Sequence, residues 1–290
     1  MNGILTALVT PFDEDQRLDV ATFEAQCRRQ IDAGIHGLVP CGTTGETPTL
    51  SDEEWETVVR TAVRTSAGTV PVLAGVGTNN TRSTVAFCER AQTCGASHGL
   101  LVLPYYNKPN PDGLREHVRQ AINVGLPLML YHVPHRTGQH VPAPLLAELA
   151  SMDGIVAVKE ATGDLRYGTE LITATQTAIL SGDDFSFLGL LAQGGTGCVS
   201  VVSNVVPAAT VAVFNAWERG DHAEAIRRFQ ALFPLMTWLM EVSNPIHAKA
   251  ALAVLGFGGP TTRPPLVGRS DDLPVTRVRA LVDAAESAEP

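Results

Sequence analysis

Eight short apolar runs, rich in β-branched residues, recur along most of this chain, and segments with helical spacing separate them. The runs are Ile4–Thr10, Gly37–Gly42, Val70–Gly77, Gly99–Pro104, Pro127–Pro134, Gly154–Ala161, Ala178–Asp183 and Gly197–Asn204. Apolar strands that alternate with helices indicate a parallel sheet covered on its faces. Eight such units are the number that closes a (β/α)8 barrel, the TIM-barrel fold, so we predict this fold.

Helix start signals follow the apolar runs. In Leu50-Ser51-Asp52-Glu53-Glu54, Ser51 can cap a helix and Glu54 stands three residues further on, as in a capping box. Other starts are expected near Asp19, Thr81, Asp112, Ala143, Asp164, Asp184 and Pro207.

After the eighth unit the chain shows helical patterns but no further convincing strand. The helical stretches are Ala223–Met240, His247–Leu255 and Leu273–Ser287. We therefore predict a barrel over residues 1–220 and a C-terminal helical lobe over residues 221–290.

A doubly wound sheet is the competing architecture. Its nucleotide-binding form would need a G-x-G-x-x-G turn, and the nearest match is Gly75-Val76-Gly77-Thr78-Asn79-Asn80. Asn80 stands where the third glycine or alanine belongs, which disfavours a nicotinamide site.

Composition narrows the classes of function. The 290 residues carry a formal net charge of -9, which opposes a nucleic-acid partner because phosphate binding needs clustered Lys and Arg. No apolar run approaches the ~18 residues of a membrane span, and the start MNGILTALVTPFDEDQ lacks the basic flank of a signal peptide. The five cysteines are scattered without metal-ligand spacing, which favours reduced thiols, a cytoplasmic protein and no metal.

Polar residues gather where the predicted strands end, the edge at which TIM barrels carry their active sites. Strand two ends in Cys41-Gly42-Thr43-Thr44-Gly45-Glu46, a turn whose hydroxyls and backbone N–H groups could hold a carboxylate or phosphate. Strand four ends in a segment with Tyr106, and strand five ends in a segment with Tyr131 and Arg136. Each has a plainer interpretation: a simple turn, core tyrosines with a solvated hydroxyl, and a surface charge.

Lys159 is the most informative of these residues. It follows Ile155-Val156-Ala157-Val158 on a strand expected to be buried on both faces. Burial disfavours an ammonium ion and favours the neutral, nucleophilic amine. An ion pair with Glu160 is the alternative, but successive strand side chains point to opposite faces. A buried amine beside phenols, hydroxyls and a guanidinium favours covalent catalysis on a carbonyl acid.

Four motifs together resemble the dihydrodipicolinate synthase (4-hydroxy-tetrahydrodipicolinate synthase) family, in the pyruvate-dependent class I aldolase superfamily that includes N-acetylneuraminate lyase. They are Gly42-Thr43-Thr44-Gly45-Glu46, Pro104-Tyr105-Tyr106-Asn107, Tyr131-His132-Val133-Pro134-His135-Arg136-Thr137-Gly138 and Val158-Lys159-Glu160-Ala161-Thr162-Gly163-Asp164. Ser181-Gly182-Asp183-Asp184 and Asn244-Pro245-Ile246 extend the resemblance over nearly the whole chain.

The resemblance implies condensation of pyruvate with L-aspartate 4-semialdehyde, on the route to diaminopimelate and lysine. Lys159 would form an imine with pyruvate, and Tyr131 would shuttle protons. Thr43 and a Tyr106 from a neighbouring subunit would hydrogen-bond to Tyr131.

In the same resemblance Thr44 would hold the pyruvate carboxylate, and Arg136 would orient the semialdehyde through its own carboxylate. The backbone at Gly182 and Val199 would line the pocket. No cofactor or metal is expected, and the family usually forms a homotetramer built as a dimer of dimers.

The sequence departs from the family pattern at several positions. His132 replaces an asparagine, and His135 and His247 also differ; we interpret all three as packing or loop residues. Positions that match the lysine feedback site carry Asp52, Trp55 and Ser83, whereas Asn79 and Tyr105 fit it. The glutamate that pairs with the ligand's ammonium is missing, so we predict weak or absent inhibition by lysine.

Two other functions stay open at this point. A sister aldolase would keep Lys159 and Tyr131 and accept a sugar acid or another aldehyde. A barrel that binds an oxo acid without turnover would not need the proton relay of Tyr131, Thr43 and Tyr106.

Overall fold

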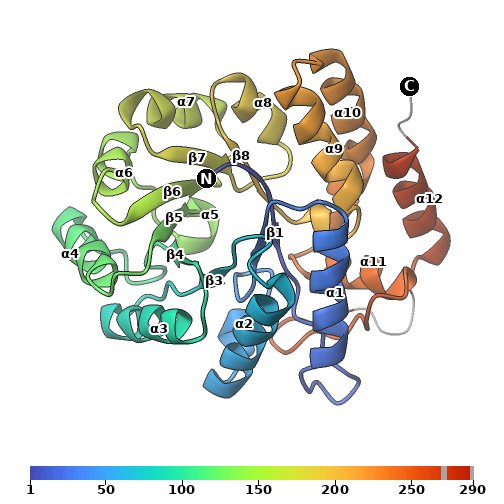
Figure 1. Ribbon diagram of the computed structural model, residues 1–290, viewed down its shortest axis with the longest axis horizontal. Helices are drawn as coiled ribbons and strands as arrows, with labels where there is room; N and C mark the ends of the chain where they lie inside the picture. The colour runs from blue at the N-terminus through green and yellow to red at the C-terminus, as the bar shows by residue number, and fades with distance from the viewer. Residues whose placement is uncertain (269–272, 288–290) are drawn as a thin grey trace. The chain divides into compact units, whose positions relative to one another are not determined.

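The computed structural model describes residues 1–268 and 273–287. Figure 1 shows strands and helices alternating along the chain. The strands are β1 (Gly3–Ala7), β2 (Gly37–Val39), β3 (Leu73–Gly75), β4 (His98–Val102), β5 (Leu128–His132), β6 (Ile155–Glu160), β7 (Ala178–Ser181) and β8 (Gly197–Ser200).

The helices following the strands are α1 (Val20–Asp32), α2 (Asp52–Ser66), α3 (Thr81–Thr93), α4 (Pro111–Ile122), α5 (Pro134–Thr137), α6 (Ala143–Ala150), α7 (Leu165–Ala174), α8 (Phe187–Ala192) and α9 (Pro207–Glu218). The C-terminal helices are α10 (His222–Leu239), α11 (Ile246–Val254) and α12 (Val275–Glu286). Two 3-10 turns, η1 (Thr47–Thr49) and η2 (Val202–Asn204), complete the described elements.

Each of the eight predicted apolar runs overlaps one strand, although β1 and β4 begin one residue before their runs, and the three predicted C-terminal helices are present. The fold is therefore a (β/α)8 barrel with a C-terminal helical extension, as predicted. The strands are shorter than the runs because the backbone turns before the apolar sequence ends. In the last run, for example, β8 is followed by η2.

Local side-chain bonds set the helix starts. Ser51 and Glu54 form the predicted capping box, and Asp19 and Asp164 cap α1 and α7. The start expected near Asp184 was wrong by a few residues, since α8 begins at Phe187. The carboxylate of Asp183 instead accepts a hydrogen bond from the backbone N–H of Ser186 at 3.2 Å, which holds the segment before α8 as a turn.

Contacts between Cα atoms divide the chain into two compact units. Unit 1 contains residues 1–2 and 71–199, and unit 2 contains residues 3–70 and 200–290. This division differs from the expected boundary at residue 220 between a barrel and a C-terminal lobe. That boundary stays a prediction, and part of the expected lobe, residues 221–290, lies outside the described residues.

Unit 1 contains strands β3 to β7 and β8 up to Val199, and these strands pair in parallel and in chain order. Tyr131 of β5 pairs with Lys159 of β6, which in turn pairs with Leu180 of β7. Parallel pairing in this register brings the ends of these strands to one level. Unit 2 contains the parallel pair β1 and β2 with α1, α2 and α9 to α12.

The turn that was weighed as a nucleotide fingerprint has a packing role in unit 1. A Cβ at Gly77 would lie 2.4 Å from the backbone nitrogen of Val102, too close for any side chain. The glycine therefore lets the chain after β3 run against the backbone of β4.

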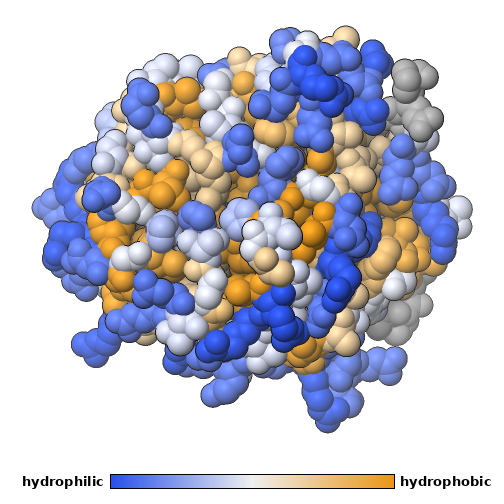
Figure 2. Space-filling view, in the orientation of Figure 1, coloured by the Kyte–Doolittle hydropathy of each residue, from blue (hydrophilic) through white to orange (hydrophobic). Residues whose placement is uncertain are grey.

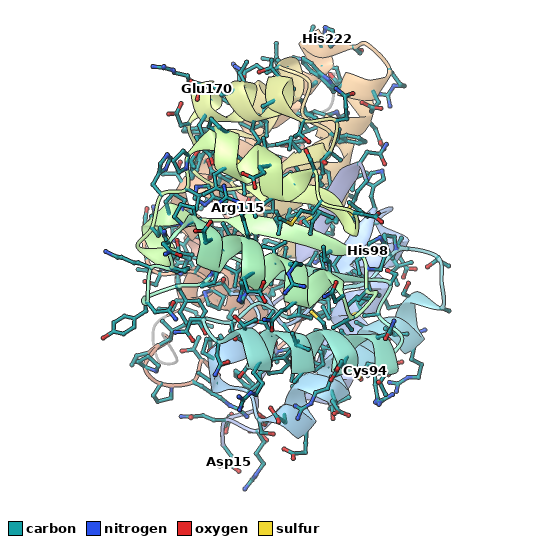
Figure 3. The ribbon with its side chains drawn as sticks, turned by 90° about the vertical axis from the view of Figure 1, so that its left-hand side faces the viewer. Asp15, Cys94, His98, Arg115, Glu170 and His222 are labelled. Atoms are coloured by element: carbon teal, nitrogen blue, oxygen red, sulfur yellow. The ribbon has the colours of Figure 1, made fainter. Side chains whose placement is uncertain are left out.

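Polar side chains cover the outer helices of unit 1. In Figure 2 hydrophilic residues gather over α4, at the left edge of the view. Arg115 projects from the outward face of α4 in Figure 3, and its guanidinium donates two hydrogen bonds to Glu148 of α6 at 2.6 and 2.8 Å. This bidentate pair links two neighbouring helices.

Candidate active site

Lys159 lies near the carboxyl end of β6 and is only 6% exposed, as its strand position predicted. The alternative, an ion pair with Glu160, is not what the structure shows. Glu160 points elsewhere, and its carboxylate accepts a hydrogen bond from the backbone N–H of Thr162 at 2.6 Å. The amine of Lys159 is thus buried without a carboxylate partner within residues 1–268 and 273–287.

Tyr131 lies directly beside this amine. Its side chain is 5% exposed, and the Nζ atom of Lys159 is 4.1 Å from the centroid of its ring. A primary amine and a phenol held together in a buried site can form an imine and transfer the protons that imine chemistry requires.

Gly182 follows β7 and leaves room for the lysine side chain. Its backbone N–H donates to the carbonyl of Glu160 at 2.6 Å, which holds it against β6. A Cβ at this position would lie 2.8 Å from both Cγ and Cε of Lys159. Any side chain at Gly182 would therefore displace the amine. Val199, on β8, is buried with 1% exposure.

Tyr106 and Arg136 are exposed side chains of the same unit. Tyr106 has a backbone φ of +72° and is 88% exposed, and its N–H donates to the carbonyl of Thr137 at 3.1 Å. Arg136 is exposed on the short helix α5. Within the described residues neither side chain forms a hydrogen bond or ion pair with Lys159, and both are exposed.

Thr43 and Thr44 belong to unit 2, in the turn between β2 and η1. Thr43 is exposed, whereas Thr44 is 4% exposed and its Oγ1 atom accepts a hydrogen bond from Nδ2 of Asn244 at 2.8 Å. The N–H groups of Gly45 and Glu46 donate to carbonyls of the turn itself. The N–H groups of Thr43 and Thr44 are therefore the candidate donors for an anion.

Comparisons with known proteins identify the family. A model of the dihydrodipicolinate synthetase family matches residues 1–284. The chain belongs to this family.

Among its relatives is the 4-hydroxy-tetrahydrodipicolinate synthase of Methanoculleus marisnigri, 42% identical over 91% of this chain and 92% of that protein. A solved structure described as the first monomeric dihydrodipicolinate synthase variant has a TM-score of 0.94 and 34% identity, and covers 99% of this chain and 97% of its own. The lysine-bound enzyme of Cyanidioschyzon merolae has a TM-score of 0.93 and 35% identity, with 98% of this chain and 99% of its own covered.

The three histidines that we interpreted as packing or loop residues occupy packed or exposed positions. His132 is fully buried, and its ring lies 5.5 Å from that of Tyr167. His247 is stacked on Trp238 at 4.2 Å, and His135 is exposed on α5. Burial lowers the pKa of His132 to about 4, so this ring is neutral at physiological pH.

The five cysteines are free and buried, which agrees with the expected reduced thiols. Burial raises the pKa of the Cys88 thiol to about 12, so this thiol is unreactive. Across the described part of the chain no cluster of His, Cys, Asp and Glu has the arrangement of a metal site, and none of the helices there could cross a membrane.

One pair of charged residues was missed by the sequence reasoning. Lys249 of α11 forms a buried ion pair with Glu46, the last residue of the turn that carries Thr43 and Thr44. A lysine inside the apolar run Ala248-Lys249-Ala250-Ala251-Leu252 was the available signal, because burial of a cation requires a partner.

Proposed function

We propose that this protein is a 4-hydroxy-tetrahydrodipicolinate synthase, a Schiff-base lyase that condenses pyruvate with L-aspartate 4-semialdehyde. The observation that carries the proposal is the buried amine of Lys159 against the ring of Tyr131, with no carboxylate partner among residues 1–268 and 273–287. The family match over residues 1–284 supports the choice of substrates.

The amine of Lys159 attacks the ketone carbon of pyruvate, and water leaves as the imine forms. Loss of a proton from the pyruvate methyl group gives an enamine, whose terminal carbon attacks the aldehyde carbon of the semialdehyde. The amino group of the second substrate then displaces the lysine amine, which closes the ring and frees the enzyme. Tyr131 carries protons to and from these groups.

The remaining site residues bind and orient the substrates. The hydroxyl and N–H of Thr44 hold the pyruvate carboxylate, and Arg136 binds the carboxylate of the semialdehyde with its planar fork. Thr43 and Tyr106 tune the phenol of Tyr131 by hydrogen bonding. The backbone at Gly182 and Val199 lines the pocket.

We assign the protein to the cytoplasm and to a homotetramer in which Tyr106 serves a neighbouring subunit. The exposure of Tyr106, at 88%, supports a role outside its own chain. A relative described as a monomeric variant makes the oligomeric state worth measuring directly. Sedimentation at the assay concentration tests it, and full activity in a monomer would contradict the role of Tyr106.

One sample tests the main proposal. The protein is incubated with pyruvate and borohydride and analysed by peptide mass spectrometry, and the same preparation is assayed with aspartate semialdehyde. We expect a reduced adduct on Lys159 and turnover. An adduct without turnover would instead indicate a sister aldolase, which a panel of aldehydes would identify. Absence of an adduct would reject imine chemistry.

A further inference from the structure

A second buried lysine lies in unit 2. Lys249 of α11 and Glu46 form an ion pair in which each side chain is 1% exposed. The Nζ atom of Lys249 also donates to the carbonyl of Thr261 at 2.8 Å and lies 4.1 Å from the ring centroid of Phe12. Charge, hydrogen bond and aromatic ring together fix this ammonium in one place.

A contribution to the free energy of unfolding does not by itself explain the ion pair between Lys249 and Glu46. Desolvation of two charges can exceed their attraction, and well-packed apolar residues in their place are often as stable. Glu46 also has a left-handed φ of +53°, a backbone conformation that is strained for a residue other than glycine. This arrangement instead fixes the position of the Glu46 carboxylate.

That carboxylate is held from two sides, and the turn is tied to it. Arg263 donates its backbone N–H to Oε2 of Glu46 at 3.0 Å, while Lys249 binds Oε1. The N–H of Glu46 donates to the carbonyl of Thr43 at 3.1 Å. Displacement of Glu46 would therefore move Thr43.

The adjoining residues of the turn are confined as well. Thr10 donates its hydroxyl to the carbonyl of Gly45 at 2.8 Å, and a Cβ at Gly45 would lie 3.1 Å from the backbone nitrogen of Cys41. Asn244, just before α11, donates to the hydroxyl oxygen of Thr44. A hydroxyl that accepts this bond keeps its own hydrogen for donation to an anion. The segment that contains Lys249 therefore meets the turn at two points.

We propose that Lys249 is a positioning residue for the turn at residues 42–46. It acts through Glu46 to hold the hydroxyl of Thr44 and the N–H groups of Thr43 and Thr44 where they bind the carboxylate of the oxo-acid substrate. The inference rests on the proposed function and adds residues of the C-terminal lobe to the determinants of oxo-acid binding. Lys249 itself touches neither substrate nor reacting atoms in this scheme.

Four variants separate positioning from simple stability. Lys249→Met leaves Glu46 buried without its cation, and Glu46→Gln leaves Lys249 without its anion. The double variant Lys249→Met with Glu46→Gln removes both charges. Arg277→Met breaks the exposed pair between Arg277 and Glu241 in the same unit and serves as the control.

The measurements are the melting temperature, KM for pyruvate, kcat, and the rate of borohydride trapping at Lys159. We expect Lys249→Met to raise KM for pyruvate about 10- to 100-fold, because small misplacements of binding groups cost about that much. The double variant regains melting temperature because no unpaired charge is buried, but its KM stays high. Arg277→Met should have the melting temperature and the KM for pyruvate of the parent.

The double variant tests the positioning role of Lys249 even if Lys249→Met does not fold. A KM for pyruvate within about twofold of the parent in this variant would reject the positioning role, since loss of positioning should raise KM about 10-fold or more. The parent protein reports on the proposed function separately. If it forms no adduct with pyruvate, the proposed function fails; if it forms the adduct and the double variant keeps a normal KM, only the role of Lys249 fails.

Discussion

Two lysines of this protein are buried, and their surroundings differ in one respect that decides their chemistry. Lys159 is 6% exposed and Lys249 is 1% exposed, and each Nζ lies 4.1 Å from an aromatic centroid. Lys249 has the carboxylate of Glu46 and a backbone carbonyl as partners. In the described part of the chain, the amine of Lys159 has no such anion and faces a phenol.

Burial alone therefore does not identify a nucleophilic lysine. Burial lowers the pKa of Lys249 to about 8, while the neighbouring Glu46 opposes that shift. At neutral pH this side chain is therefore a cation engaged in a structural pair. An amine that is buried without an anion is the one available to attack a carbonyl.

Replacing each lysine should give the largest difference between the two sites. We expect Lys159→Ala to abolish the borohydride adduct with pyruvate and to lower turnover by about 10⁴-fold or more, as for other covalent catalysts. Lys249→Arg keeps the charge beside Glu46 and should keep the adduct on Lys159. Peptide mass spectrometry of both variants checks this, and an adduct that persists in Lys159→Ala would place the nucleophile elsewhere.

The rings beside the two amines offer the next test. Tyr131→Phe gives Lys159 the kind of ring that Phe12 gives Lys249, with the phenol removed. Loss of a general acid–base group should lower kcat by about 10²- to 10⁴-fold. The matched control is Tyr167→Phe, another buried tyrosine of unit 1, whose hydroxyl donates to the carbonyl of Val141 at 2.7 Å. Steady-state kinetics should show little change in kcat for the control, and an equal loss in both variants would remove the special role of Tyr131.

The sequence predicted Lys159 and missed Lys249 for a physical reason. Strand periodicity is local, so eight apolar runs sufficed to place Lys159 at a strand end beside the strand that carries Tyr131. The ion pair of Lys249 depends on a contact with Glu46, far away in the chain, which no local pattern encodes. The exposure of Tyr106 and Arg136 is likewise not readable from spacing, since it depends on how loops fold.

The start of α8 shows the same limit on a smaller scale. Asp184 looked like a helix start, but the turn from Ser181 to Ser186 is held by its own side-chain bonds. Such bonds compete with helix formation, and the winner depends on the exact geometry at the end of β7.

The stability of the protein should depend on pH through Lys249. In the unfolded chain a lysine has a pKa of about 10.4, whereas the folded pKa of Lys249 is about 8. Between these values the unfolded state holds more protons, so the free energy of unfolding contributed by Lys249 should rise with pH across this window, by at most about 3 kcal/mol.

Urea unfolding at a series of pH values from neutral to about pH 10 measures this contribution, as the difference between the parent and the double variant that lacks both charges. The subtraction cancels the groups that titrate in both proteins. A difference that falls with pH instead would mean that Glu46 outweighs burial and raises the pKa of Lys249.

Free lysine carries a third amine, and as an inhibitor of the enzyme it should have the smallest of these effects. Its ammonium would need an anion, as Lys249 needs Glu46, yet the position expected to supply one carries Ser83, half-buried on α3. Of the other matching positions, Trp55 is 1% exposed and is a core residue. One member of the family has been seen with lysine bound.

We expect millimolar lysine to change the initial rate of this protein by less than about twofold, because a hydroxyl contributes far less than an ion pair with a carboxylate. Ser83→Glu should increase the inhibition and Ser83→Ala should not. Inhibition of the parent at micromolar lysine would show that another carboxylate, such as Asp52, takes over the role of the missing glutamate.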